Sequence, residues 1–292
     1  MNIDILHTFV IVVEAGSMAE AARRLNVAPT TIAQQMRALE RDVGSALLTR
    51  AGRSLQPTLA GRRALERARL IVNAARDLRS EAHDAELPNG PLLLGATHSA
   101  ISGLLPKALK SWSQSRPEIE VHIEEDDTIP LIEKVTKNEL DAAVVVKTGF
   151  ALPKTCIWQD LRSEELILAT HDKITIGSPL EIISTQPYIR FERSVVGGRM
   201  AEAYLQSHGL NPRAQYELDG VENIARLVSE GIGVALLPDC RTVANAALEI
   251  KRWKLPPPVP SRTIGYMANA TSARVALAEL FGHLLREAAR LR

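Results

Sequence analysis

The chain has 292 residues, enough for two or three domains, and its 46% hydrophobic content allows a sizeable core. Its formal net charge of +1 identifies no partner, but the charges are unevenly placed. Residues 1–80 carry twelve arginines, no lysine and seven acidic residues, a net charge of +5, whereas the remainder carries −4. A basic front end on a slightly acidic body is typical of a polyanion-binding module joined to another domain, although a merely solvated surface has the same composition.

The cysteines and apolar runs argue against several classes of protein. Only Cys156 and Cys240 occur, far apart in the sequence, so there is no disulfide framework and no cysteine-based metal motif. We expect both thiols to be buried filler, because a redox switch would require them to be close in space. The apolar run at 9–13 is too short for a membrane span and lacks the layout of a signal peptide. We therefore expect a cytoplasmic protein with no membrane association.

The chain begins with two predicted helices. Apolar residues at helical spacing predict a first helix that ends near Gly16: Ile3, Leu6, Phe9, Val10 and Val13. Ser17 followed by Glu20 has the spacing of a capping box, in which each side chain satisfies a free backbone N–H, and it predicts a second helix over 18–25. Asn26 suits the left-handed conformation that ends such a helix.

A third helix, over 29–42, separates an apolar face from a polar one. Pro29 fits its first turn, where the missing N–H has no partner to lose. At about 100° per residue, the apolar residues that gather on one side are Ile32, Met36, Leu39 and Val43. The opposite side carries hydroxyl, amide and guanidinium groups, from Thr30, Gln34, Arg37 and Arg41. Such groups bond base edges or phosphates, so the pattern indicates a DNA-reading helix-turn-helix, or else a helical bundle with a polar exposed side.

Residues 45–57 are interpreted as a short hairpin, or wing, that turns at Ala51-Gly52. Arg50 and Arg53 flank the turn, where they can meet phosphates or the minor groove. With double-stranded DNA as the expected partner, the candidate DNA-binding residues are Ser17, Pro29, Thr30, Thr31, Gln34, Arg37, Arg41, Arg50 and Arg53.

The order of these landmarks resembles the N-terminal winged helix-turn-helix of LysR-type transcriptional regulators. The resemblance runs without a gap and depends on Phe9, Gly16-Ser17, Ala21-Ala22, Leu25, Ala38-Leu39-Glu40, Gly44, Leu47, Arg50, Thr58 and Gly61. Met18 and Leu48 replace aromatic residues that are common in the family, and both are core replacements. Ala33 and Gln34 stand where the family often has serine and arginine. This last difference concerns the target sequence rather than DNA binding itself.

A long linker helix is predicted at 59–87, after the DNA-binding domain at 1–58, with Thr58 as its N-cap. Small and apolar residues step through it by three and four, as in a coiled-coil seam: Gly61, Ala64, Ala68, Ile71, Ala75, Leu78, Ala82 and Ala85. The helix could instead dock on the protein's own body. The LysR resemblance implies a homodimer through this helix, and a homotetramer, presenting recognition helices in pairs to a roughly palindromic site.

Beyond the break at 87–91, "LPNGP", apolar runs alternate with helical stretches. The predicted strands lie at 92–96, 121–123, 142–146, 166–169, 188–191, 216–218, 234–237 and 264–267. Continuous valine, leucine and alanine runs indicate strands buried on both faces, and hence a mostly parallel α/β fold. The resemblance implies an effector-binding domain over 91–292, with two lobes like those of a periplasmic binding protein. Lobe I is expected at 91–163 and 268–292, and lobe II at 164–267.

Ligands of such sheets bind beyond the carboxyl ends of the strands, where helices start. The candidate effector-binding residues at these positions are Thr97, His98, Ser99, Thr128, Lys147, Phe191, Arg193 and Asp219. Each of them also has an interpretation as a cap, turn or surface group, and Asp126 and Asp127 have the same two interpretations. Arg193 with Thr97 and Ser99 would suit a carboxylate-bearing effector.

No catalytic motif is present: there is no G-x-S-x-G elbow, Walker loop, H-E-x-x-H or dinucleotide fingerprint. We therefore expect no catalytic residue, no metal and no cofactor besides a small-molecule effector. The prediction is a LysR-type regulator controlled by that effector between the two lobes, with RNA polymerase as a further partner. The rival hypothesis is an α/β solute-binding or enzymatic protein whose helical front end serves only oligomerisation.

Overall fold

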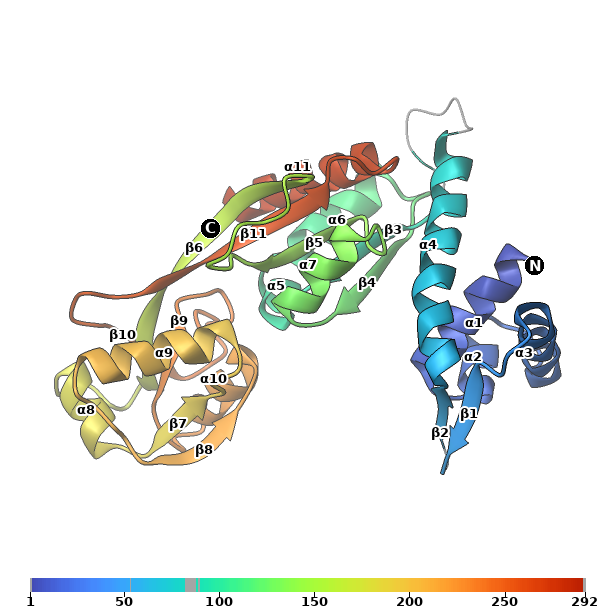
Figure 1. The fold of residues 1–292 in the computed structure, drawn as a ribbon. Coiled ribbons are helices and arrows are strands. Elements are labelled where there is room, and N and C mark those ends of the chain that lie inside the picture. The colour runs from blue at the N-terminus through green and yellow to red at the C-terminus, as the bar shows by residue number, and fades with distance from the viewer. Residues whose placement is uncertain (1, 53, 82–87, 89, 291–292) are drawn as a thin grey trace. The chain divides into compact units, whose positions relative to one another are not determined.

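The computed structural model describes residues 2–52, 54–81, 88 and 90–290, and for residues 79–81 the backbone alone. The chain divides into two units, 1–89 and 90–292, each with hydrophobic clusters of its own. The division falls within the proline- and glycine-containing break at 87–91. The first unit consists of helices and a hairpin, and the second of sheets with helices packed on them (Figure 1).

The first unit has the element order of a winged helix-turn-helix: α1 (Ile3–Ala15), α2 (Met18–Arg24), α3 (Pro29–Val43), β1 (Leu48–Ala51), β2 (Ser54–Pro57) and α4 (Leu59–Glu81). The third helix starts at Pro29 as predicted and ends one residue later than predicted, at Gly44, whose φ of 72° is left-handed. Asn26 also has the predicted positive φ, 52°. Strands β1 and β2 pair from Leu48 opposite Pro57 to Ala51 opposite Ser54, which forms the predicted wing.

The predicted capping box at the start of α2 is wrong. Ser17 occupies the N-cap with extended backbone, but within the described residues its hydroxyl makes no capping hydrogen bond. The Glu20 carboxylate instead pairs along the helix with Arg23 and, at 3.4 Å, with Arg24. Attraction between charges one turn apart therefore prevails over the reciprocal cap.

One face of each helix forms the core of this unit. The buried residues that α1, α2 and α3 contribute are Leu6, Phe9, Val12, Ala21, Ala22, Ile32, Met36 and Leu39. Ile3 and Val43, which share the apolar spacing, are 37% and 44% exposed because they lie at the ends of their helices. Burying each large apolar side chain is worth roughly 1.5–3 kcal/mol, so the three buried residues of α3 strongly determine its rotation.

The first half of the predicted seam of the linker helix α4 packs against the core of the first unit. Ala68 is fully packed, Ala64 contacts the same core, and a Cβ on Gly61 would meet the Leu47 carbonyl oxygen at 2.0 Å. Thr58 caps the helix as predicted, because its Oγ1 accepts a hydrogen bond from the Gly61 N–H at 2.9 Å. Helix and wing therefore form one closely packed body.

The second half of the seam remains on the surface of α4. Helix α1 packs along α4, and an ion pair of 2.9 Å joins Glu14 to Arg69. The exposed large apolar side chains of α4 are Leu59, Leu70, Ile71 and Leu78. The last two seam positions, Ala82 and Ala85, lie outside the described residues.

The second unit alternates strands and helices: β3 (Leu92–Ala96), α5 (His98–Gly103), α6 (Leu105–Ser115), β4 (Val121–Glu125), α7 (Thr128–Thr136), β5 (Ala142–Val146), β6 (Cys156–His171), α8 (Pro179–Thr185), β7 (Tyr188–Phe191), α9 (Val196–Ser207), β8 (Ala214–Leu218), α10 (Val221–Ser229), β9 (Ala235–Pro238), β10 (Ile250–Lys254), β11 (Ser261–Asn269) and α11 (Val275–Arg290). Every predicted strand is present, but β6 and β11 are far longer than their apolar runs. The sequence did not predict β10, because three of its five residues are charged.

Two long strands, β6 and β11, connect the two lobes of this unit (Figure 1). Strand β6 pairs with β11 up to Glu165 and then with β9 and β10 from Leu166 onward. Strand β11 pairs with β5 over 264–268, so the chain has returned to the sheet of the first lobe before residue 268, where the sequence placed that return.

The expected mostly parallel arrangement is wrong for these connecting strands. Strand β3 runs parallel to β4 and β5, and β7 runs parallel to β8. In contrast, β6 is antiparallel to β9, β10 and β11, and β11 is also antiparallel to β5. A chain that leaves one lobe and comes back must cross twice in opposite directions, so adjacent crossings are antiparallel.

A buried ion pair holds the beginning and the end of the first lobe together. The Arg274 and Asp141 side chains are 0% exposed and lie 2.9 Å apart. Arg274 Nη2 also donates to the Pro91 carbonyl at 2.7 Å, and Asp141 Oδ2 accepts from the Leu93 N–H at 2.9 Å. Segments nearly the full length of the unit apart thus share one hydrogen-bonded cluster.

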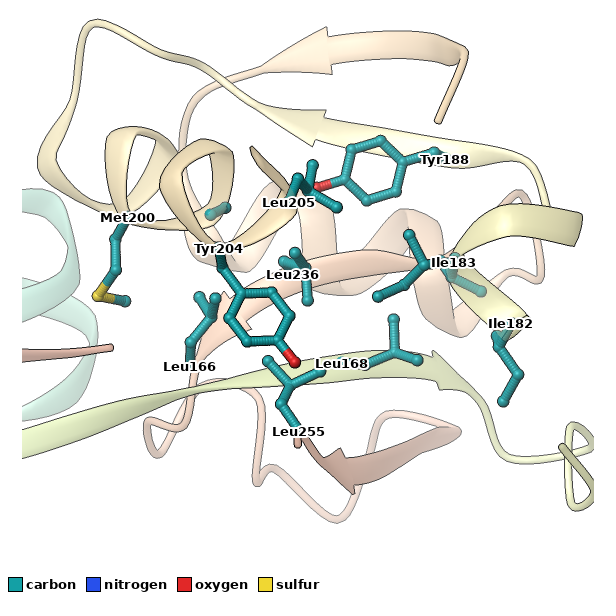
Figure 2. Close-up of a cluster of buried hydrophobic side chains, with 12 residues drawn as sticks. Leu166, Leu168, Ile182, Ile183, Tyr188, Met200, Tyr204, Leu205, Leu236 and Leu255 are labelled. Atoms are coloured by element: carbon teal, nitrogen blue, oxygen red, sulfur yellow. The ribbon is translucent and has the colours of Figure 1, made fainter. Parts of the chain in front are cut away.

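The second lobe has a continuous apolar core beside the connecting strands. Figure 2 shows Tyr204 of α9 lying over Leu166 and Leu168 of β6, with Leu205 beside Tyr188 in the same cluster. The Tyr204 hydroxyl donates to the Pro256 carbonyl at 3.0 Å, and burial raises the pKa of that phenol. Helix α9 is therefore held against β6 by this core and by the Tyr204 hydrogen bond.

Among the described residues, no single helix is long and apolar enough to cross a membrane. Helices α1 and α2 pass that test only as a pair bent by 119°, and their apolar residues Leu6, Phe9 and Val12 are buried in the core of the first unit.

Candidate functional site

The outer face of α3 presents a polar row that the core behind it orients. Ile32, Met36 and Leu39 point inward and are almost fully buried. The side chains on the opposite face that are exposed are Thr30, Gln34, Arg37 and Arg41. The last three line one shallow depression together with Gly44, Ser45 and Ala46, so amide and guanidinium groups share a single surface.

The end of α3 is tied to the wing. The Glu40 carboxylate accepts hydrogen bonds from the Leu47 N–H at 2.8 Å and the Leu48 N–H at 3.2 Å. Arg50 lies on β1, opposite Leu55, and is exposed. These two hydrogen bonds, from backbone N–H groups of the wing to a side chain of α3, hold the wing against the helix. Arg50 and the polar row of α3 therefore belong to one surface.

The other candidate DNA-binding residues lie around this row. Pro29 is exposed at the start of α3, and Thr31 is half-buried beside it. Ser17 is half-buried at the N-cap of α2. Arg53 lies outside the described residues.

A cavity of about 880 Å³ lies in the second unit, lined from both lobes and from the connecting strand β11. Seven of the eight candidate effector-binding residues line it: Thr97, His98, Ser99, Thr128, Lys147, Phe191 and Asp219. They come from the carboxyl ends of strands and the starts of the helices that follow. In an α/β fold the carboxyl ends of the parallel strands meet at one edge of the sheet, so side chains at these ends come together.

Arg193 departs from the sequence prediction. It is not among the described residues that line the cavity, its side chain is 54% exposed, and its Nε lies 3.6 Å from the Glu217 carboxylate. The proposed set of Arg193 with Thr97 and Ser99 is therefore not assembled. The guanidinium groups in the lining belong to Arg199 and Arg262.

The first lobe supplies polar groups in different states of pairing. Nδ1 of His98 lies 2.8 Å from the Glu125 carboxylate. The Thr128 hydroxyl accepts a hydrogen bond from the Val146 N–H at 3.3 Å, so it holds α7 against β5. Thr97, at the N-cap of α5, has a buried hydroxyl with no hydrogen-bond partner among the described groups.

Lys147, which follows β5, is held at the cavity by a cluster of residues from β6. Its ammonium lies 3.0 and 3.2 Å from the two carboxylate oxygens of Asp160 and 5.8 Å from the centre of the Trp158 ring. The Trp158 indole N–H, at 2.5 Å, and the Lys147 ammonium lower the pKa of Asp160. The lysine charge is thus largely offset before any ligand binds.

Arg262 and Glu164 form a buried ion pair on the two connecting strands. Nε of Arg262 donates to Glu164 at 2.9 Å, and both side chains are about 5% exposed. Arg162 adds a second contact to Glu164 at 3.4 Å. Burial of charge at this point is tolerated because the two partners satisfy each other.

The second lobe closes the cavity with an aromatic wall and a helix start. Phe191 packs against Gly197, and a Cβ on Gly198 would meet the Glu192 carbonyl oxygen at 1.8 Å, so the chain turns tightly into α9. Asp219 is exposed before α10, and its Oδ1 accepts from the Gly220 N–H at 2.6 Å. These residues place one carboxylate and one aromatic ring opposite the first lobe.

Sequence reasoning missed three charged residues of the lining: Glu125, Arg199 and Arg262. Asp126 and Asp127, which the sequence left open between ligand binding and helix capping, also line the cavity, and Asp127 directly precedes α7. It occupies the N-cap, yet within the described chain it makes no side-chain capping bond. Arg262 had no local signal, because its partner Glu164 is 98 residues away.

The two cysteines lie in separate cores. Cys156 packs against the cluster of the first lobe and Cys240 against a cluster of the second. Burial raises the pKa of the Cys240 thiol, which reduces the thiolate needed for redox chemistry. His171, Asp172 and Glu249 bring ligand atoms within 4.8 Å of one another, but Nδ1 of this histidine already accepts the Lys173 N–H. We assign no function to either feature.

Comparisons with known proteins agree with this organisation. The family described as "Bacterial regulatory helix-turn-helix protein, lysR family" matches residues 3–62, and "LysR substrate binding domain" matches residues 85–290. A curated relative, the HTH-type transcriptional regulator GltR of Bacillus subtilis, is 26% identical over 238 residues, which cover 82% of this chain and 80% of the relative. The uncharacterized HTH-type transcriptional regulator YnfL of Escherichia coli is 29% identical over 265 residues, 87% of each chain.

Solved structures share the fold over the whole chain. CbnR, described as a LysR family transcriptional regulator, has a TM-score of 0.68 at 23% identity and covers 99% of this chain and 100% of its own. Full-length OxyR from Pseudomonas aeruginosa has a TM-score of 0.69 at 20% identity and covers 100% and 95%. The predicted fold class, a winged helix-turn-helix followed by a linker helix and a two-lobed α/β domain, is confirmed. The chain belongs to the LysR family of DNA-binding transcriptional regulators, whose second domain binds an effector.

Proposed function

We propose that the polar row of α3 reads an operator in the major groove and that the wing grips the adjacent backbone. The observation that carries the proposal is the exposed row backed by three nearly fully buried residues, Ile32, Met36 and Leu39. An amide or guanidinium that reads a base must be held in a fixed position, and this core holds it. Gln34 and Arg37 supply base contacts, and Arg50 supplies a phosphate contact.

Dimerisation through α4 brings two such rows together. Ile71 and Leu78 lie about 20° apart on the helix, and Leu70 and Leu59 extend this apolar face. An exposed apolar stripe on a long helix finds its partner in a second copy of the same stripe. Two recognition helices then address a roughly palindromic site, and pairs of dimers form a tetramer.

The cavity in the second unit receives the effector. A ligand bound there can change the assembly only through different affinities for its alternative states, and lobes joined by two strands provide such states. We further propose that the protein acts in the cytoplasm, catalyses no reaction, uses no cofactor besides the effector, and works with RNA polymerase at the promoter.

DNA binding is tested by titrating duplex binding with salt, using the full-length protein and promoter fragments beside its own gene. A reader of bases loses affinity steeply as salt rises because phosphate contacts release counterions, yet it still prefers one fragment over shuffled sequence. Equal affinity for all fragments, or no affinity at all, would support the rival enzyme or solute-binding hypothesis.

The dimer is tested with Leu78→Glu. The buried charge should convert the assembly to monomers in sedimentation velocity and weaken operator binding, because the two half-sites are then bound independently. Arg62→Glu is the matched control, since Arg62 is exposed on α4 about 160° around the helix from Leu78. An unchanged assembly in Leu78→Glu places the interface elsewhere.

A further inference from the structure

The acidic groups of the effector cavity are less well paired than its basic groups. Glu125 has His98 at 2.8 Å, and Asp126 has the Lys134 ammonium at 3.1 Å. Asp127 from the first lobe and Asp219 from the second have no cationic partner in the described part of the chain. Both are exposed and both line the cavity.

Each basic group of the cavity, by contrast, is already engaged. Lys147 binds both oxygens of Asp160, Arg262 binds the buried Glu164, and Arg199 donates to the Ser194 carbonyl. The first two ammonium and guanidinium charges are offset by protein carboxylates. The charges left for a ligand are therefore the Asp127 and Asp219 carboxylates, one on each lobe, and the Arg199 guanidinium.

A second, independent feature indicates a ligand with a polar end. The Thr97 side chain is 91% buried, as its exposure is 9%, and its hydroxyl has no hydrogen-bond partner among the described groups. A buried hydroxyl without a partner is costly, so Thr97 favours a ligand atom that accepts a hydrogen bond.

We propose that the effector is an amino acid whose ammonium group binds Asp127 and Asp219 and whose carboxylate faces Thr97. The inference rests on the proposed function, since it names the chemical class bound at the effector cavity. A cavity of about 880 Å³ has the size of a small-molecule site. It keeps the carboxylate-bearing effector that the sequence suggested but leaves Arg193 out of the site.

This chemistry also explains how binding changes the protein. Asp127 and Asp219 lie on opposite lobes, so an ammonium bound by both attracts each lobe toward the ligand. An amino acid therefore favours the approach of the lobes along β6 and β11, whereas a plain carboxylate does not. That difference in affinity between two states is what an effector requires.

The class of ligand is tested on the full-length protein by thermal shift and calorimetry with the standard L-amino acids. Every amino acid that binds is compared with its 2-oxo acid, which lacks the ammonium, and its decarboxylated amine. At least one amino acid should bind, and both analogues should bind at least about tenfold more weakly, the loss expected for a charge-assisted hydrogen bond. A 2-oxo acid that binds as tightly overturns the proposal, as does the failure of every amino acid at about 10 mM.

The two carboxylates are tested with Asp127→Asn and Asp219→Asn. Each substitution should weaken binding of the amino acid at least about tenfold, because the amide that replaces the carboxylate carries no charge to balance the ammonium. The difference in affinity between the amino acid and its 2-oxo acid should therefore become smaller. Asp172→Asn, an exposed substitution outside the cavity lining, is the matched control and should bind as the parent does. Unchanged binding in both cavity variants overturns the assignment.

Operator binding is measured on the same preparations to separate the two proposals. Variants at Asp127 and Asp219 that keep the sequence preference of the parent show that the DNA-binding function stands, whatever the ligand result. A parent protein without sequence preference refutes the proposed function, even where an amino acid binds to the cavity.

Discussion

The α3 surface and the effector cavity position their polar groups in opposite ways. The row on α3 comes from one continuous helix, points into solvent, and is oriented by apolar residues behind it. The cavity gathers side chains from strand ends far apart in the chain, and some of these are held by buried ion pairs such as Arg262–Glu164. A change in the row should therefore alter one contact with DNA, whereas a change beneath the cavity should alter the fold.

The largest expected effect of this difference is at Arg274. Arg274→Met leaves the fully buried Asp141 carboxylate without its ion-pair partner, which should cost the second unit about 3–5 kcal/mol in its free energy of unfolding. Urea unfolding followed by tryptophan fluorescence measures it, because Trp112, Trp158 and Trp253 all lie in this unit. The first-unit control Glu20→Gln, in an exposed pair, should cost about 0–1 kcal/mol by circular dichroism. Equal losses in the two variants contradict the comparison.

The next effect is at Gly61, where α4 meets the wing. Gly61→Ala places a methyl group 2.0 Å from the Leu47 carbonyl oxygen, and the forced shift should cost about 1–3 kcal/mol and weaken binding to all duplexes. Thermal unfolding and a binding titration measure the two losses. Gly103→Ala is the matched control, because nothing lies within 4 Å of a Cβ at that position. Wild-type stability in Gly61→Ala would show that helix and wing are not closely coupled.

A smaller and more selective effect is expected on the row itself. Gln34→Ala should remove the preference at one or two base positions, worth about 1–3 kcal/mol, while the fold stays intact. Arg50→Ala should weaken binding to all sequences alike, because a phosphate contact carries no sequence information. Binding to a library of single-base operator variants distinguishes the two. Uniform weakening by both substitutions would remove Gln34 from base reading.

The smallest effect is expected at Arg193, which the structure places outside the cavity lining. Arg193→Ala should leave both operator affinity and the effector dose–response within about twofold of the parent, since an exposed pair with Glu217 contributes about 0–1 kcal/mol. Reporter induction across effector concentrations is the measurement. A suppressed response would return Arg193 to the site.

Local patterns predicted the parts of the fold that depend on neighbours in sequence. The start of α3 at Pro29, the left-handed Asn26 and the Thr58 cap follow from backbone preferences within a few residues. The strands of the second unit followed from apolar runs, but β10 escaped because its sequence is charged. The half of the capping box that depends on the Glu20 carboxylate failed because this group pairs with Arg23 and Arg24 on its own helix.

Contacts between distant segments decided the rest. Helical spacing placed Ala68 and Ile71 in one seam, but the packing of α1 on α4 buried the first and left the second exposed. The direction of β6 and β11 depended on which lobe each segment joins, a choice that apolar runs do not encode. Arg262 became part of the cavity only because Glu164, distant in sequence, lies beside it in the sheet.

By itself, the sequence determined that this protein has a basic helix-turn-helix with a polar row, a long linker and an α/β body, because periodicity and capping act over one or two helical turns. The tertiary structure alone decided which charges face the cavity and which are neutralised beneath it. Pairing energies between charges depend on distance and burial, and neither quantity can be obtained from spacing along the chain.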